Sequence, residues 1–246
     1  MNKSRDWKKG PKKQRDRSQA PRPASPPSPQ RMAQMLEKSG IRLNHEQLNQ
    51  LWRYHNLIRE RNQDRELTRI IGFEPMVIKH YVDCMIVGKF LTLPSPLVDI
   101  GTGAGFPGIP LKIRYPHLKL ILAEPRPKRI EFLKEVIRKL DLKNVEVFEH
   151  KVVSESFQRP MAGAITRAVE TVDKTLLRTS ACLGEGGLVI YMKGPSAQPE
   201  IEQALKQFAG KFRLALDREY QLPGTSHERR IVVFEKLVPA EARRPA

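Results

Sequence analysis

The chain has 246 residues, of which 39% are hydrophobic, so it can form one core of catalytic size with a small accessory part but hardly two full domains. Its formal net charge of +17 makes nucleic acid the leading partner, because such a field attracts polyanions. Two cysteines exclude a disulfide scaffold, six scattered histidines predict no metal site, and no apolar run approaches the ~20 residues that cross a bilayer.

Residues 1–31 differ in composition from the rest of the chain. They contain ten Lys and Arg residues and two acidic residues, so +8 of the net charge lies there and +9 in the remainder. The segment is rich in proline and poor in apolar side chains, and it cannot offset its ordering entropy by burial. We predict a disordered basic arm that either touches RNA phosphates or has no measurable role. It has no apolar signal segment, so we expect a cytoplasmic protein without membrane contact.

Residues 32–93 carry helical patterns. Asn44 followed by Gln47 is the pattern of an N-terminal capping box, and apolar side chains then recur at helical spacing as far as Ile58. A further helix is predicted over residues 75–91, because a proline suits the first helical turn and a broad apolar face follows. We therefore expect a helical N-terminal subdomain over residues 32–93.

From residue 96 onward, predicted strands and helices alternate. The strands cover residues 97–100, 118–123, 145–149, 163–166 and 188–192. One predicted helix follows the first strand and ends near residue 114, and three others cover residues 127–140, 172–182 and 200–208. A turn is predicted at residues 184–187. Such βα units predict a parallel sheet wrapped by helices. The last two strands, 212–221 and 229–236, lack a crossover helix between them and should pair antiparallel. Residues 94–238 thus form an α/β domain, followed by a tail at 239–246.

A glycine-rich loop follows the first predicted strand. At Gly101, Gly103 and Gly105 a backbone without Cβ atoms can approach a nucleotide-like cofactor, and the next helix offers free N–H groups. The order of strand, acid and glycine loop favours S-adenosylmethionine, with Asp99 near the loop backbone or the ammonium group of the cofactor. A competing frame that starts at Gly103 matches the dinucleotide fingerprint G-x-G-x-x-G. In that fingerprint the first glycine directly follows the strand, whereas Gly103 comes two residues after that position. Antiparallel C-terminal strands are typical of methyltransferases and favour the first frame.

Charged residues stand at three other strand ends. Glu124 follows the second strand, where a carboxylate can accept hydrogen bonds from both ribose hydroxyls of an adenosine. Arg167 and Lys193 end the fourth and fifth strands, at the edge where open α/β sheets bind ligands. Our hypothesis is that Arg167 anchors the cofactor carboxylate or a substrate phosphate and that Lys193 contacts the target nucleotide. A surface carboxylate, structural ion pairs and solvated cations are the alternatives.

Longer runs resemble one known family. They are LVDIGTGAGFPGIPL at residues 97–111, PKRIEFL at 127–133, ITRA at 165–168, MKG at 192–194 and VIKHYVD at 77–83. Together they resemble the RsmG (GidB) family of bacterial methyltransferases, which modify guanine N7 in small-subunit (16S) rRNA. The resemblance implies a class I (Rossmann-like) methyltransferase fold with a seven-stranded sheet, and S-adenosyl-L-methionine as cofactor. Its implied substrate is small-subunit rRNA, free or in an assembling particle.

The family pattern and the glycine loop together predict the cofactor site. The predicted cofactor-binding residues are Gly101, Thr102, Gly103, Gly105, Phe106, Glu124, Val152, Val153 and Arg167. Three positions depart from the family's usual residues: Lys79 replaces an arginine, Glu124 an aspartate and Val153 a frequent glutamate. Glu124 keeps the ribose role with a longer reach. At Val153 only a backbone N–H is expected to reach the adenine.

The chemistry implied by the resemblance does not require a general base. Guanine N7 carries an in-plane lone pair and no proton, so methyl transfer there depends on positioning rather than on a general base. Residues 166–169, TRAV, replace the Asn/Asp-Pro-Pro-aromatic motif of amino-group methylases. The predicted catalytic residues are Arg167 and Lys193, and the predicted RNA contacts are Lys79, His80, Lys128, Arg129 and Lys193. For His80, a packing role within the helix is an equal alternative.

Two other functions stay open. One is an RNA-binding protein with a methyltransferase-like fold and weak or no activity, and the other is a methyltransferase for a different RNA. The basic surface disfavours a small-molecule substrate. We expect the protein to act as a monomer.

Overall fold

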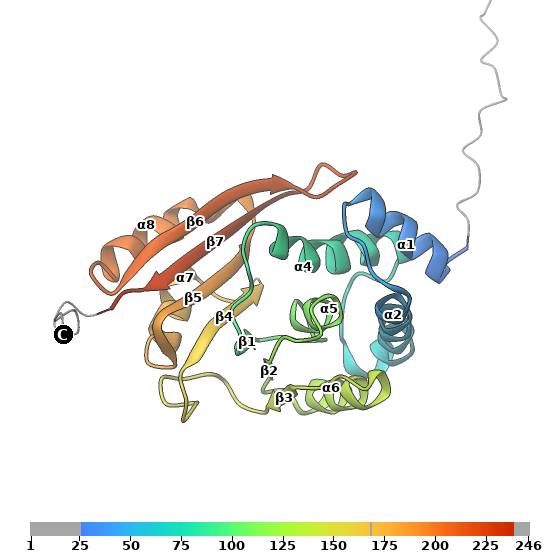
Figure 1. Ribbon diagram of the computed structural model, residues 1–246, viewed down its shortest axis with the longest axis horizontal. Helices are drawn as coiled ribbons and strands as arrows, with labels where there is room; N and C mark the ends of the chain where they lie inside the picture. Colours follow the sequence, from blue (N-terminus) through green and yellow to red (C-terminus); the bar gives the residue numbers. More distant parts are fainter. Residues whose placement is uncertain (1–25, 168, 239–246) are drawn as a thin grey trace, which may run out of the picture.

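The computed structural model describes residues 26–167 and 169–238. Within them, seven strands form one sheet in the order β3-β2-β1-β4-β5-β7-β6 (Figure 1). The strands are β1 (Leu97–Ile100), β2 (Leu120–Ala123), β3 (Val145–Phe148), β4 (Met161–Arg167), β5 (Leu183–Lys193), β6 (Phe212–Gln221) and β7 (Glu228–Lys236). The first five are parallel, and β7 pairs antiparallel with both β5 and β6. The predicted α/β sheet with antiparallel C-terminal strands is confirmed.

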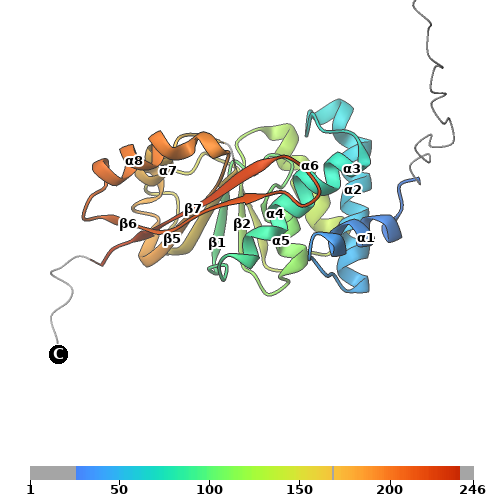
Figure 2. The ribbon, with the colours of Figure 1, turned by 90° about the horizontal axis from the view of Figure 1, so that it is seen from above.

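The sheet separates two hydrophobic cores, because successive side chains of a strand point to opposite faces. In β1, Leu97 belongs to one core, whereas Val98 and Ile100 belong to the other. The first face is covered by α5 (Gly108–Arg114) and α6 (Pro127–Leu140), and the second by α7 (Val172–Thr179) and α8 (Gln198–Gln207) (Figure 2). A short 3-10 turn, η3 (Pro195–Ala197), precedes α8. Both faces of the sheet are therefore buried.

The N-terminal helices extend the first core. They are α1 (Pro29–Lys38), α2 (His45–Arg65), α3 (Phe73–Met76), the π-helical η1 (Val77–Val82), α4 (Asp83–Met85) and the 3-10 helix η2 (Ile86–Lys89). The predicted capping box at α2 is confirmed, since Asn44 and Gln47 exchange side-chain-to-backbone hydrogen bonds of 2.9 Å. Buried side chains of α1, α2 and η1 share one core with those of β1 and α6. These helices therefore pack on the sheet as part of the same core.

Several predicted boundaries are wrong, and the helix predicted over residues 75–91 is a run of four short helical segments from Phe73 to Lys89. The first helix begins at Pro29 rather than near Met32, because the Ser28 side chain accepts a hydrogen bond from the Arg31 N–H and caps it. The predicted arm therefore ends before residue 31, and its residues 1–25 lie outside the described residues, as does the predicted tail. The turn predicted at residues 184–187 is part of β5, where the register with β4 shifts. α7 ends at Thr179 instead of 182.

Over the two described stretches, no helix has both the length and the apolar character needed to span a bilayer.

Candidate active site

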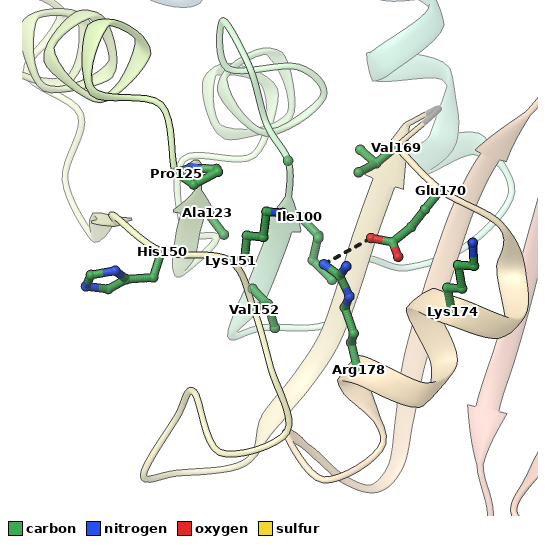
Figure 3. Close-up of a pocket in the computed structure, with 11 residues that line it drawn as sticks. Ile100, Ala123, Pro125, His150, Lys151, Val152, Val169, Glu170, Lys174 and Arg178 are labelled. Carbon is green, nitrogen blue, oxygen red and sulfur yellow. Dashed lines mark ion pairs between the residues drawn. The ribbon is translucent and has the colours of Figure 1, made fainter.

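The carboxyl ends of β1 to β4 meet at one edge of the sheet, and a cavity of about 370 Å³ lies there. Its walls come from four strand ends and α7: Ile100, Gly101, Ala123, Pro125, His150, Lys151, Val152, Val169, Glu170, Lys174 and Arg178 (Figure 3). Of the predicted cofactor residues, Gly101 and Val152 line this cavity directly. Sequence reasoning missed Lys174 and Arg178, because only the folded chain brings α7 beside the strand ends. Arg178 pairs with Glu170 at 3.1 Å.

The glycine loop needs glycine for both conformation and space. Gly101 has φ +66° and Gly105 has φ +105°, in the region that residues with a Cβ rarely adopt. A Cβ on Gly101 would lie 2.8 Å from the Val169 side chain, and one on Gly105 would lie 2.5 Å from that of Ile109. The N–H of Gly101 donates to the Ala123 carbonyl at 2.9 Å. The loop is thus held against the end of β2.

Asp99 fastens the loop to the helix that follows it. Its Oδ2 accepts hydrogen bonds from Thr102 Oγ1 at 2.5 Å and from the Gly108 N–H at 2.7 Å. Its Oδ1 is buried without a hydrogen-bond partner among the described residues. Burial raises the pKa of this carboxyl to about 7, although both hydrogen bonds oppose the shift. The expected contact with the loop backbone is therefore present, and one carboxylate oxygen is left without a partner.

Glu124 lies directly after β2 and is 3% exposed. Its Oε2 accepts a hydrogen bond from the Gly103 N–H and its Oε1 accepts one from the Arg126 N–H, both at 3.0 Å. Arg129 Nη1 lies 3.8 Å from Oε2. A carboxylate has about four acceptor sites, so it can accept hydrogen bonds from a bound ligand in addition to these two. The side chain is therefore positioned between the glycine loop and the start of α6.

Arg167, at the end of β4, turns toward the N-terminal helices. Its Nη1 donates to the Lys79 carbonyl at 3.2 Å and lies 3.4 Å from Asp83 Oδ2, and its Nη2 lies 3.1 Å from His80 Nδ1. The guanidinium also lies over the Phe106 ring, 5.1 Å from its centroid. Arg167 thus joins the sheet to the helical segment whose sequence is VIKHYVD.

His80 is buried in the same cluster. Its ring stacks on Phe106 with centroids 4.3 Å apart, and its Nε2 lies 2.9 Å from Thr68 Oγ1. Burial and the positive charge of Arg167 lower the pKa of His80 to about 3. The neutral ring therefore accepts at Nδ1 and donates at Nε2. Both nitrogens have protein partners, which places His80 as a packing and positioning group.

Asp83 connects this cluster to the C-terminal hairpin. It lies 3.4 Å from Arg167 and 3.6 Å from Arg229, and it accepts a hydrogen bond from Tyr220 Oη at 3.1 Å. The β6–β7 hairpin accordingly reaches over α4 (Figures 1 and 2). His80 and Asp83 lie three residues apart, a spacing that can place both on one helix face, and both contact Arg167. The sequence carries no signal for Tyr220, which is 137 residues further along the chain.

The other predicted residues are more dispersed. Lys193 Nζ lies 2.7 Å from both the Glu170 carbonyl and Glu200 Oε2, so the side chain is held between the segment that precedes α7 and α8 itself. The side chain of Val153 is 50% exposed, and its N–H donates to Ser156 Oγ at 2.7 Å. The N–H expected to reach an adenine is therefore already bonded, because residues 153–156 form a turn.

Two predicted RNA contacts lie at the seam between α2 and α6. Lys128 Nζ approaches the Asp64 carbonyl at 3.5 Å, and Arg129 Nη2 donates to the Glu66 carbonyl at 3.2 Å. The side chain of Arg129 is 23% exposed. Lys79 is half-buried on η1. The structure thus does not gather the predicted RNA contacts into one patch.

Sequence comparison identifies relatives over most of the chain. Residues 47–221 match the family model described as "GidB: rRNA small subunit methyltransferase G". A "Ribosomal RNA small subunit methyltransferase G 2" of Syntrophobacter fumaroxidans is 50% identical over 87% of this chain and 43% of its own length. A protein of the same name from Bdellovibrio bacteriovorus is 41% identical over 84% of this chain and 81% of its own. The chain thus spans less than half of the first relative and most of the second.

Solved structures share the fold at low sequence identity. A methyltransferase from Pyrococcus furiosus has a TM-score of 0.55 at 13% identity, covering 77% of this chain and 99% of that one. A ribosomal protein L11 methylase from Lactobacillus delbrueckii subsp. bulgaricus has a TM-score of 0.51 at 15% identity, covering 65% and 79%. At these identities the likeness shows a methyltransferase-type fold alone.

Proposed function

Because the chain belongs to the GidB family of rRNA small subunit methyltransferases, we propose that it transfers a methyl group from S-adenosyl-L-methionine to N7 of a guanine in small-subunit (16S) rRNA. The proposal rests chiefly on the glycine loop, which Asp99 and Glu124 hold at the carboxyl edge of the sheet. The protein acts as a monomer in the cytoplasm, on rRNA that is free or in an assembling subunit.

The residues around the cavity fit this cofactor. Gly101 lines the cavity without a side chain, and Val152 supplies an apolar wall. Glu124 is buried with acceptor sites to spare, which suits two ribose hydroxyls. When bound, S-adenosylmethionine supplies an activated methyl group on a sulfonium. Thr102, Gly103 and Gly105 shape the loop beside it.

Arg167 lies at the boundary between the cofactor and the substrate. Among the residues that the structure describes, hydrogen bonds of its guanidinium involve only Nη1 and Nη2, which leaves Nε–H to donate to the cofactor carboxylate or a substrate phosphate. Phe106, His80 and Asp83 hold the guanidinium in place from three sides. Arg167 is therefore the residue whose position depends most on the helical segment.

The reaction needs orientation more than proton transfer. Guanine N7 attacks with its own lone pair, and the task of the protein is to hold that atom in line and exclude water. The buried titratable side chains of the site suit this requirement, because His80 and Asp83 are engaged by Arg167 and Asp99 holds the loop. Lys79, Lys128 and Arg129 contribute positive charge for RNA, whereas the charge of Lys193 is paired with Glu200 at 2.7 Å.

The decisive experiment combines methyl transfer with position mapping. The purified protein is incubated with small-subunit rRNA and S-adenosylmethionine carrying a labelled methyl group, and N7-methylguanine is located by chemical strand cleavage. Label incorporation together with cleavage at a single guanine supports the proposal. Incorporation without N7 cleavage would assign another position or another RNA, and cofactor binding without any incorporation would favour an inactive RNA-binding protein.

A further inference from the structure

A second cavity, of about 560 Å³, lies between the loop that follows α2 and the start of α6. Three arginines line it, Arg69, Arg126 and Arg129, together with one carboxylate, Glu66. Arg69 and Arg126 are exposed and form no ion pair with any residue that the structure describes. The cavity, which we call the arginine pocket, therefore presents a surplus of positive charge to solvent.

The seam between α2 and α6 shows why this surplus is notable. Further along the seam, Arg61 pairs with Glu135 at 2.9 Å and Arg65 pairs with Glu131 at 3.2 Å. Carboxylates of α6 thus pair with Arg61 and Arg65 of α2, whereas in the arginine pocket only Arg129 has a described carboxylate partner, Glu124 at 3.8 Å. An anion is the partner that would complete the charge pattern, since guanidinium groups bind phosphate oxygens in a bidentate manner.

The arginine pocket adjoins the cofactor loop. Arg129 Nη1 lies 3.8 Å from Glu124 Oε2, and a Cβ built on Gly103 would lie 3.6 Å from the same nitrogen. Its opposite wall is held in place because Asn62 exchanges hydrogen bonds of 2.8 and 3.0 Å with the backbone of Thr68. Thr68 Oγ1 in turn contacts His80 Nε2. The pocket is therefore preformed and is connected to the cluster that holds Arg167.

We propose that the arginine pocket binds a backbone phosphate of the RNA strand next to the target guanosine. The proposal rests on the proposed function for the identity of the strand, and it adds Arg69 and Arg126 as RNA-binding residues. The pocket favours a phosphate, because it adjoins the glycine loop through Arg129 and a polynucleotide carries a phosphate at every nucleotide. Phosphate contacts fix the register of a strand without reading its sequence.

The test compares two double variants that remove the same charge. Arg69→Ala with Arg126→Ala empties the arginine pocket, whereas Arg42→Ala with Arg218→Ala removes two exposed arginines outside it. Binding of in-vitro transcribed small-subunit rRNA is measured over a range of salt concentrations, and cofactor affinity is measured by calorimetry. We expect the pocket variant to bind RNA roughly 10- to 100-fold more weakly near 0.15 M salt. The slope of log K against log salt should fall by roughly 0.7 to 0.9, the value for one phosphate.

The outcomes separate this inference from the proposed function. A pocket variant that matches the control variant in both RNA affinity and salt slope contradicts the phosphate site. Replacement of both residues by lysine should restore most of the salt slope, since charge is retained. If the pocket variant binds rRNA more weakly than the control variant but the wild-type protein forms no N7-methylguanine, the proposed function fails while the arginine pocket stands.

Discussion

Two buried aspartates anchor neighbouring regions of the site in different ways. Asp99 binds Thr102 and Gly108, three and nine residues further along the chain. Asp83 instead binds Arg167 and Tyr220, which lie 84 and 137 residues away. The glycine loop is therefore a local structure, whereas the cluster around Arg167 exists only after the helices, the sheet and the C-terminal hairpin have come together. Changes in the first should act on the cofactor, and changes in the second on the whole fold.

The largest effect is expected from Arg167→Ala. It leaves the buried Asp83 without its closest cationic partner, and such a loss costs about 3 kcal/mol or more of the free energy of unfolding. Cofactor affinity and methyl transfer should fall with it. Arg213→Ala, which removes an exposed pair with Glu235, should cost at most about 1 kcal/mol. Urea unfolding measures both, and equal stability of the two variants would show that the cluster does not hold the fold.

A change at His80 should alter stability on the acid side. Folding lowers the pKa of His80 to about 3, so its contribution is present above pH ~6.5 and is lost as the pH falls toward 3. His80→Asn keeps an acceptor for Arg167 and cannot be protonated. The variant should therefore lose less stability than wild type between pH 6.5 and 4, by roughly 1.4 kcal/mol per pH unit at most. The exposed His117→Asn serves as control, and identical pH profiles of all three proteins would contradict the assignment.

The glycine loop should show the opposite pH dependence. Folding raises the pKa of Asp99 from 3.8 to about 7, so its contribution is present below pH ~4 and is lost as the pH rises toward 7. In the cofactor-free protein, Asp99→Asn should remove this loss of folding stability. The loss is roughly 1.4 kcal/mol per pH unit and amounts to about 4 kcal/mol at most. The exposed Asp141→Asn is the matched control. Thermal unfolding at pH 5 and pH 7 distinguishes them, and an unchanged slope in Asp99→Asn would rule out this carboxyl as the cause.

Glu124→Gln is expected to have the smallest effect on stability. Its main effect should be on the affinity for the cofactor. The amide keeps the shape of the side chain but loses the charge and one acceptor, so affinity for S-adenosylmethionine should fall about tenfold, or ~1.4 kcal/mol. Glu149→Gln, at an exposed ion pair with Lys134, should leave affinity unchanged. Calorimetry measures both, and the ribose role of Glu124 is lost if the two variants bind equally well.

Much of the fold could be predicted because its signals are local. The capping residues Asn44 and Gln47 lie one helical turn apart, and the alternation of strand and helix after residue 96 reports the parallel sheet. The boundaries that were predicted wrongly depend on local signals that are weaker than a capping box or an apolar pattern. Ser28 caps a helix ahead of the apolar pattern, and β5 absorbs extra residues opposite Met161 and Gly163.

The sequence by itself determined the glycine loop and the family, because strand, aspartate and glycines follow one another within a dozen residues and their hydrogen bonds depend on that order. Only the tertiary structure decided which way Arg167 turns, that Lys193 is held by Glu200, and that Arg69 and Arg126 line one pocket. A long cationic side chain has several carboxylates and carbonyls within reach. Which of them it meets depends on how distant elements pack, and chain order does not specify that.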